Sequence, residues 1–318
     1  MGRPLPVPER HRPSHERFPH LRDFELPGFT YDEPPYGGLQ FRFCSETSAR
    51  AAFSEFADRI ESAVGRSYLP VYRLADGEFG FMVSERTRPA GVTGSELRAA
   101  AGSVLRRLRG TTVTCWGERY AGSERAAALA RFTSCLRRVA AAGVLAPYFA
   151  RRPDRWGEAY FRPVCHWLDA HDVVVGEDNY TPFYAVYALL NGPRRKGLYV
   201  GRRILVVTHL TETREEAIRS ALLAEGARSV EFVAISASRS MFERIDAATI
   251  RRDADIALVA AGIGSVAVLD QLEPLSIPCI DCGITIECMI RPELRWERPF
   301  LIDDERSDPG TLRQHRRF

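Results

Sequence analysis

The chain has 318 residues, of which 45% are hydrophobic, enough for one large domain or two ordinary ones with a sizeable core. Its 44 basic and 41 acidic residues leave a formal net charge of +3, so nothing in the charge balance demands a nucleic-acid partner. Residues 1–20 hold no apolar signal core, and no stretch approaches the roughly 20 apolar residues of a membrane span. We therefore expect a cytoplasmic protein.

The seven cysteines are odd in number and scattered along the chain, which favours reduced thiols over a disulfide framework. Cys279 and Cys282 have Cys-x-x-Cys spacing, and Cys288 follows. Such spacing also occurs in metal and redox sites. No second Cys-x-x-Cys and no histidine pair at zinc spacing accompanies it, so we interpret these residues as buried structural cysteines.

The amino-terminal region divides into an arm and a helix. Residues 1–40 are rich in proline, arginine, histidine and glycine, and we interpret them as an extended arm that packs on the body or on a partner subunit. An amphipathic helix is predicted over 45–64, because large apolar residues recur there at i, i+3, i+7 and i+11. Gly65 is the expected stop.

The stretch that follows has an unusual local chemistry. The apolar run from Leu69 to Leu74 predicts a short buried strand, which breaks at once into Asp76-Gly77-Glu78. We expect Gly77 to turn the chain with a positive φ, so that two carboxylates share a tight turn at the open end of a strand. Such ligands suit Mg²⁺ or Mn²⁺ together with phosphate oxygens. The competing interpretation is a surface β-turn, since Asp-Gly is a common turn pair.

The next part of the chain alternates helices and strands. We predict helices over 94–109, 122–142 and 181–190, and strands over 111–116, 144–149 and 173–176. Between them, the segment 151–172 carries many aromatic and basic residues. It fits a surface that contacts a base or a sugar, and equally a peripheral packing segment.

From residue 201 the alternation is regular. Strands are predicted over 204–208, 230–235, 256–260 and 277–281, and helices over 213–225, 238–252 and 265–272. Thr213-Arg214-Glu215-Glu216 has the pattern of a capping box that opens the first of these helices. The whole pattern is typical of a mostly parallel sheet with helices on both faces, so we predict a Rossmann-like α/β fold.

This pattern also sets the expected domain organisation. We predict a single α/β domain over 41–291, with an amino-terminal half over 41–172 and a Rossmann-like carboxyl-terminal half over 173–291. A polar tail over 292–318 follows.

Two further strand ends carry groups suited to anions. Gly262-x-Gly264-Ser265 offers backbone N–H groups and a hydroxyl at a helix start, although glycine there also fits close packing alone. It lacks the third glycine and the later acidic residue of a dinucleotide fingerprint, so we do not expect NAD. Thr208 and His209 could contact a diphosphate; a capping or core-edge role for His209 is the alternative.

Two separated stretches together resemble one known family. Arg73-Leu74-Ala75-Asp76-Gly77-Glu78 resembles the Arg-x-Gly-Asp-Gly-Glu signature of the GT-D-type glycosyltransferases, a bacterial family with a Rossmann-like fold and an Asp-x-Glu metal motif. Residues 261–265, Leu269 and residues 277–283, which end in Asp281-Cys282-Gly283, resemble the family's carboxyl-terminal pattern. That pattern is a strand, a small-residue turn, a helix and a strand ending in Asp-x-Gly. The likeness covers residues 68 to 290. Ala75 departs from the family's usual glycine, and Ile284 stands where a histidine is expected.

The resemblance implies transfer of a sugar from a nucleoside-diphosphate sugar, UDP being one carrier, to an acceptor hydroxyl or amine. It implies that Asp76 and Glu78 hold Mn²⁺ or Mg²⁺ against the diphosphate, while Arg73 orients these carboxylates or contacts phosphate. Asp281 and Glu287 are the candidate carboxylates on the acceptor side, Asp281 also as a metal-shell partner.

Two other hypotheses stay open. One is a metal-dependent phosphohydrolase that uses the same two acids. The other is a degenerate module that binds a nucleotide without turnover, which the departures at Ala75 and Ile284 favour. Neither the acceptor nor the oligomeric state follows from the sequence, and a homo-oligomer stays open.

Overall fold

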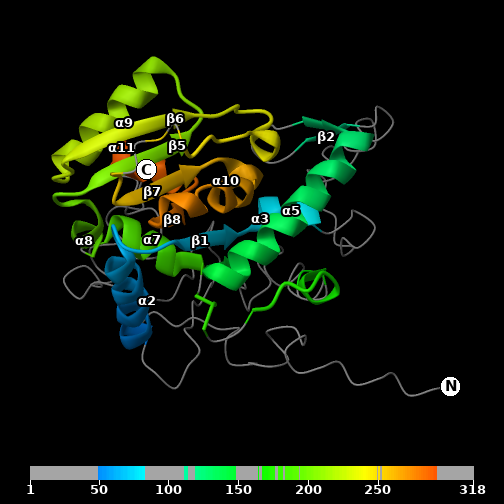
Figure 1. Cartoon of the computed structure of the whole chain (residues 1–318), viewed down its shortest axis with the longest axis horizontal. Helices are drawn as coiled ribbons and strands as arrows, with labels where there is room; N and C mark the ends of the chain where they lie inside the picture. Colours follow the sequence, from blue (N-terminus) through cyan, green and yellow to red (C-terminus); the bar gives the residue numbers. More distant parts are fainter. Residues whose placement is uncertain are drawn as a thin grey trace, which may run out of the picture.

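The computed structural model of the chain describes residues 49–82, 111–113, 119–147, 164, 167–175, 178–181, 183–192, 194–248, 250 and 253–291 (Figure 1). The arm expected over 1–40, the helix expected over 94–109, most of 151–172 and the tail over 292–318 lie outside these residues.

The centre of the molecule is a six-stranded sheet in the order β4-β1-β8-β7-β5-β6, and its neighbouring strands are all parallel. The strands are β1 (Leu69–Leu74), β4 (Val144–Pro147), β5 (Arg203–Thr208), β6 (Ser229–Ala234), β7 (Ile256–Ala260) and β8 (Pro278–Asp281). The expected Rossmann-like α/β fold is confirmed. Strands from both expected halves of the chain join this one sheet, since β1 pairs with β8.

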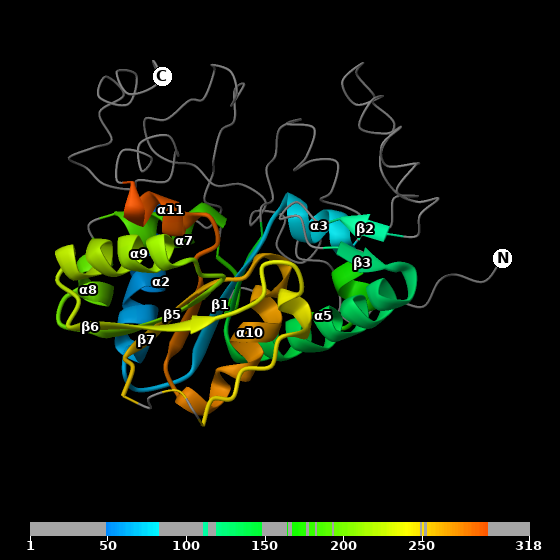
Figure 2. The same ribbon diagram turned by 90° about the horizontal axis from the view of Figure 1, so that it is seen from above.

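Helices cover both faces of the sheet (Figure 2). One layer holds α2 (Ala49–Ala63), α7 (Phe183–Asn191), α8 (Arg195–Tyr199), α9 (Glu212–Ala224) and α11 (Thr285–Ile290), and the other holds α3 (Asp76–Met82), α5 (Gly122–Ala142) and α10 (Ser265–Gln271). In β5, Ile204 and Val206 face the first layer, whereas Leu205 and Val207 face the second. Because both of their faces are buried, β5 and β7 are nearly continuous apolar runs rather than alternating ones.

A small hairpin replaces one expected strand of the main sheet. β2 (Thr111–Val113) pairs antiparallel with β3 (Arg119–Ala121) in a separate two-stranded sheet. The expectation that the strand over 111–116 belongs to the parallel sheet was therefore wrong. A parallel partner requires a long crossover, whereas β2 finds an antiparallel partner six residues on in the chain.

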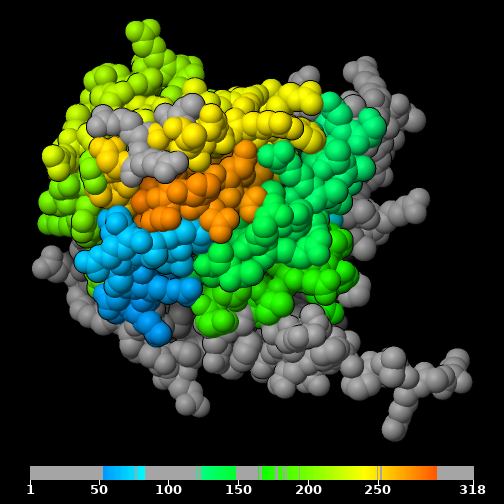
Figure 3. Space-filling view, viewed as in Figure 1, coloured from blue at the N-terminus to red at the C-terminus, as the bar shows by residue number. Residues whose placement is uncertain are grey.

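The helix expected over 238–252 was also wrong. Only the 3₁₀ turn η4 (Ser240–Phe242) forms, and residues 243–246 are irregular. The Ser236 hydroxyl accepts hydrogen bonds from the N–H groups of Ser238 and Arg239, which competes with helical bonding. The segment packs instead beside α10 and α5, as the yellow, orange and green surfaces show (Figure 3).

Residues 173–175 are not a strand, which corrects a third expectation. The chain instead runs along β4 at 179–181, where Leu145 donates to the carbonyl of Asn179 and accepts from the N–H of Thr181. The Asn179 amide reaches back to the carbonyls of Ala140 and Val174 and holds this bend in place.

The helix ends differ from expectation in two places. Thr211, not Thr213, caps α9, because its hydroxyl accepts the N–H of Arg214. The pattern in 213–216 falls within the first turn instead. The short helix α11 follows β8 where no helix was expected. In the part of the chain that the structure covers, no helix combines the length and the apolar character that a membrane crossing requires.

The topology places a switch point between β5 and β7. From β5 the chain runs through α9 outward to the edge strand β6, whereas from β7 it runs through α10 in the opposite direction to β8. The two helices lie on opposite faces of the sheet. Ligands of open α/β sheets bind at such points, outside the carboxyl ends of the strands.

Candidate functional site

The most unusual contact at the carboxyl edge of the sheet joins the ends of β1 and β8. Arg73 Nε donates to the backbone carbonyl of Asp281 at 2.8 Å and lies 3.4 Å from its Oδ2 atom. Both side chains are only 6% exposed. Because β1 and β8 are adjacent and parallel, residues 208 positions apart in sequence meet here.

Aromatic rings and a glycine enclose the Arg73 guanidinium. Its central carbon lies 5.3 Å from the ring centre of Phe183 and 4.9 Å from that of Tyr187, both on α7. Gly283, at φ +42°, lies against it so closely that an added Cβ would stand 1.9 Å from an Arg73 terminal nitrogen. Position 283 therefore requires glycine. The other terminal nitrogen of Arg73, Nη1, is buried and has no hydrogen-bond partner among the residues that the structure describes.

The segment Asp76-Gly77-Glu78 is the first turn of helix α3 and not a tight turn, so the expected positive φ at Gly77 was wrong. Glu78 Oε2 accepts the N–H of Ala75 at 3.0 Å, the reciprocal half of a capping box. Phe79 and Phe81 bury their rings in the core and hold the helix down. The two expected acidic residues thus lie in the first turn of a helix.

Burial raises the pKa of the two described carboxylates. Desolvation raises the pKa of Glu78 to about 7, and Asp281 adds to the rise, against the opposing effects of the Ala75 N–H group and Arg73. Desolvation also raises the pKa of Asp281, although Arg73 and the Ser265 hydroxyl oppose it. For Arg73, burial lowers the pKa, but Asp281 and Tyr187 outweigh it and the pKa is raised. Both carboxylates are therefore easier to protonate than exposed ones, and burial is the main cause.

These raised pKa values bear on whether a divalent cation fits. Within the described segments, no three His, Cys, Asp or Glu side chains are grouped so as to hold a metal. These segments by themselves therefore supply no complete set of protein ligands for a metal. Mg²⁺ and Mn²⁺ more often take one or two carboxylates plus substrate phosphate oxygens. A nearby cation favours the ionised form of a buried carboxylate such as Glu78, which suits that second arrangement.

The Gly262–Ser265 turn is already engaged inside the protein. The Ser265 hydroxyl accepts the N–H of Ala261 at 3.1 Å and bonds to Asp281, and the Gly264 N–H donates to the Ala261 carbonyl. A Cβ at Gly264 would stand 2.2 Å from the Ser240 hydroxyl oxygen, so glycine there permits η5 (Gly262–Gly264) to pack on η4. Phosphate binding at this turn stays a prediction.

A second group of polar residues lies at the end of β5. The buried Thr208 hydroxyl donates to the Ala260 carbonyl at 2.9 Å and joins β5 to β7. His209 follows and is exposed. Burial lowers its pKa, Arg214 lowers it further and Glu287 opposes them, so His209 lies within electrostatic range of both residues. Arg214 and Glu287 form an ion pair between α9 and α11.

The structure thus brings the predicted residues together in two groups. Arg73, Glu78 and Asp281 form one, and His209 and Glu287 belong to the other. Sequence reasoning missed the two α7 rings around Arg73 and the partner of Glu287, Arg214. The apolar pattern of 181–190 predicted a buried helix, but nothing in it indicated that its rings would pack against the Arg73 guanidinium. Gly283 had a visible signal, as the glycine of Asp-x-Gly.

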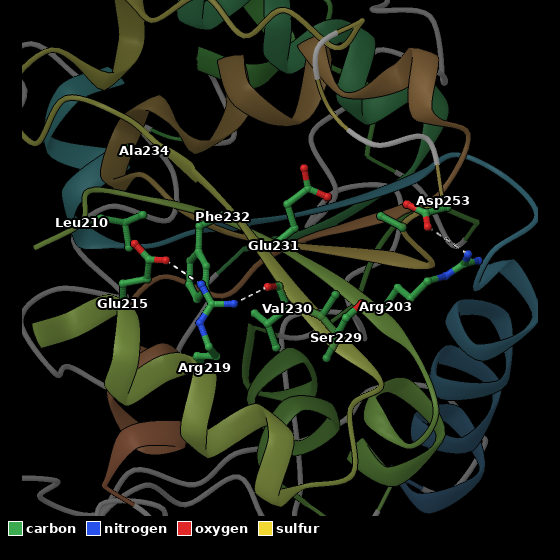
Figure 4. A pocket seen from close by; sticks show the side chains of 12 residues that line it. Arg203, Leu210, Glu215, Arg219, Ser229, Val230, Glu231, Phe232, Ala234 and Asp253 are labelled. Atoms are coloured by element: carbon green, nitrogen blue, oxygen red, sulfur yellow. Dashed lines mark hydrogen bonds and ion pairs between the residues drawn. The ribbon is translucent and has the colours of Figure 1, made fainter. Parts of the chain in front are cut away.

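A pocket away from these groups lies at the outer edge of the sheet (Figure 4). Its volume is about 440 Å³, and none of the predicted site residues lines it. Arg219 crosses it, stacking 4.7 Å from the Phe232 ring centre and donating to the Val230 carbonyl, which covers part of the free edge of β6.

The cysteines near the site, Cys279, Cys282 and Cys288, are buried, as expected. Burial raises the pKa of the Cys279 thiol. Neither Cys279 nor Cys282 is therefore a reactive thiolate at neutral pH.

Comparisons with known proteins identify a fold neighbour and no family. No protein-family model matches the chain, and no curated protein matches it. Among solved structures, one described as "Selenomethionine substituted structure of domain of unknown function 1792 (DUF1792)" has a TM-score of 0.39 and 14% sequence identity. The match covers 73% of this chain and 82% of that one. A likeness of this size contributes nothing to the assignment of function.

Proposed function

We propose that this protein is a metal-dependent glycosyltransferase that moves a sugar from a nucleoside-diphosphate sugar to an acceptor hydroxyl or amine. One observation carries the proposal. The two stretches that resemble the GT-D-type family meet at neighbouring strand ends, where Arg73 of the first holds Asp281 of the second. A chance resemblance gives no reason for two motifs to converge in a buried, charged cluster at the ligand edge of the sheet.

The proposed roles follow from the position of each residue. Asp76 and Glu78 would hold Mn²⁺ or Mg²⁺, which supplies positive charge for the leaving nucleoside diphosphate. Arg73 is a positioning residue, because its guanidinium is buried and its Nε is committed to Asp281. Asp281 would accept a hydrogen bond from a sugar hydroxyl.

A carboxylate near the acceptor hydroxyl would take its proton as the new bond forms. Glu287 suits this role better than Asp281, since it is 27% exposed and Asp281 is 6% exposed. Donor diphosphate would lie nearby along the same edge of the sheet.

A thermal-shift panel tests the proposal. Unfolding temperature is measured with UDP, GDP, dTDP and CDP, each with and without Mn²⁺, on the wild type and on Asp76→Asn/Glu78→Gln. We expect one diphosphate to raise the unfolding temperature only with Mn²⁺, and the double variant to lose the shift. The matched control is Asp58→Asn/Glu61→Gln, which removes two carboxylates from α2 and should keep the shift.

Each other outcome names a different function. If no nucleotide changes the unfolding temperature, the proposal is refuted. A shift that does not need metal would favour a module that binds without turnover. Release of inorganic phosphate from a bound nucleotide, without sugar transfer, would favour a phosphohydrolase. Where the expected shift appears, release of nucleoside diphosphate from matching sugar nucleotides identifies the donor.

A further inference from the structure

The ion pair between Arg214 and Glu287 stands at the switch point of the sheet. Arg214 lies in the first turn of α9, which follows β5, and Glu287 lies in α11, which follows β8. Their side chains are 22% and 27% exposed, so both are reachable from solvent. His209 is exposed just after β5, five residues before Arg214 in the chain, and the charges of both paired residues act on its pKa.

Arg214 keeps hydrogen-bonding capacity that the fold does not use. Its Nη1 donates to Glu287, whereas its Nε is buried without a hydrogen-bond partner among the residues described here. A buried donor left unpaired costs free energy, which a ligand acceptor can recover. The backbone at the start of α9 is not the source of this capacity, because Thr211 takes the N–H groups of both Arg214 and Glu215.

The same arginine is tied to the chain that leaves the end of β8, because its partner Glu287 lies six residues after Asp281. Burial, with Asp281 adding to it, raises the pKa of the Cys282 thiol to about 12, whereas Arg73 and Arg214 both oppose the rise. Cys282 is therefore within electrostatic reach of both guanidinium groups. Arg73 is 6% exposed and committed to Asp281, so Arg214 is the one a ligand can reach.

We propose that Arg214, with His209, binds the diphosphate of the donor, and that phosphate oxygens replace Glu287 as the partner of Arg214. This inference rests on the proposed function for the identity of the ligand, but the anion subsite itself does not. A guanidinium binds phosphate oxygens through paired N–H donors, and Arg214 offers Nε and a terminal nitrogen for this purpose. Glu287 acts as an internal competitor that holds Arg214 in place before the ligand arrives.

Calorimetric titration with inorganic pyrophosphate in metal-free buffer tests the subsite apart from the proposed metal. We expect Arg214→Gln to weaken binding roughly tenfold or more. The affinity of Arg214→Lys should lie between those of Arg214→Gln and the wild type, because lysine keeps the positive charge but loses the paired N–H donors of the guanidinium. Glu287→Gln should bind roughly threefold tighter, since the competing carboxylate is gone. Arg138→Gln removes an arginine paired with Asp270 on other elements and should leave affinity unchanged.

The pyrophosphate affinity of Glu287→Gln is the decisive measurement. A merely structural ion pair predicts weaker binding in both variants, so weaker binding by Glu287→Gln would overturn the proposal. Unchanged binding by a folded Arg214→Gln protein, or no pyrophosphate binding by the wild type, would overturn it as well. Circular dichroism checks the folding of each variant.

The two proposals fail separately. If pyrophosphate binds as expected but no sugar nucleotide is turned over, the anion subsite is supported and the glycosyltransferase activity is refuted. If a sugar nucleotide is turned over but Arg214→Gln binds pyrophosphate with unchanged affinity, the activity is supported and the subsite is refuted.

Discussion

Two arginine–aspartate pairs join neighbouring strands, and they differ in every respect that matters for function. At the amino edge, Arg203 at the start of β5 pairs with Asp255 before β7, and the two side chains are 35% and 16% exposed. Asp255 accepts the Arg203 backbone N–H at 2.8 Å as well as its Nε and Nη2. At the carboxyl edge, Arg73 and Asp281 are both 6% exposed.

The pKa values respond in opposite directions. Burial raises the pKa of Asp255, but the hydrogen bonds and charge of Arg203 outweigh it, and the pKa is lowered. At Asp281 burial wins over Arg73, and the pKa is raised. The amino-edge pair is therefore a fully hydrogen-bonded structural pair, whereas the carboxyl-edge pair contains a carboxyl group whose pKa burial keeps raised. Perturbed pKa values of this kind cluster at functional sites.

The largest expected effect comes from breaking the buried pair. Arg73→Met leaves the Asp281 carboxylate buried without its cation, and we expect it to cost about 3–5 kcal/mol in the free energy of unfolding. Urea denaturation measures this. Arg73→Met/Asp281→Leu should recover much of the loss, because an apolar pair carries no buried charge. If the double variant is as unstable as the single one, packing rather than charge accounts for the effect.

The next effect depends on pH and concerns Glu78. Its pKa rises from 4.5 in the unfolded chain to about 7 in the fold, so the carboxylate costs stability as pH rises from 4.5 to 7 and the full cost persists above. In metal-free buffer, we expect Glu78→Gln to be more stable than wild type by up to about 3 kcal/mol near pH 8. The difference should vanish near pH 4. Thermal unfolding across this range measures it, and a pH-independent difference would contradict the assignment.

Glycine at position 283 gives a steric test of the same cluster. Gly283→Ala combines a positive φ with a Cβ that overlaps Arg73, whereas Gly201→Ala has a φ of +70° and no atom within 4 Å. We expect the first to cost about 1–3 kcal/mol more than the second in unfolding free energy. Equal costs in urea denaturation would show that backbone strain alone acts at both positions.

The smallest effect should come from the amino edge. Asp255 has a lowered pKa, so its stabilisation is present above its unfolded pKa of 3.8 and is lost as pH falls through the folded value. We expect Asp255→Asn to cost about 1 kcal/mol or less at neutral pH, with salt screening part of it. Its cost should shrink toward low pH; the Glu78→Gln effect also vanishes there, but that substitution stabilises the protein at neutral pH, whereas Asp255→Asn destabilises it. A cost that grows on acidification would refute the comparison.

Much of the fold could be predicted because strand and helix periodicity are local properties. The strands at 204–208, 230–235 and 256–260 and the helix at 122–142 agree with the structure to within a residue. The helix over 238–252 failed because serine side chains there bond to nearby backbone N–H groups, which periodicity does not register. The turn at Asp76-Gly77-Glu78 failed for a related reason, since capping by Glu78 and burial of Phe79 override the turn preference of Asp-Gly.

By itself, the sequence determined the fold class and the residue types at each strand end, because hydrophobic periodicity and chain alternation carry that information. Only the tertiary structure decided that Arg73 meets Asp281, that α7 rings enclose the cation, and that Arg214 faces Glu287. Strand order places β1 beside β8, and no local pattern contains that order. A contact between residues 208 positions apart depends on which strands become neighbours. Burial where these strands meet then shifts the pKa values of the side chains there.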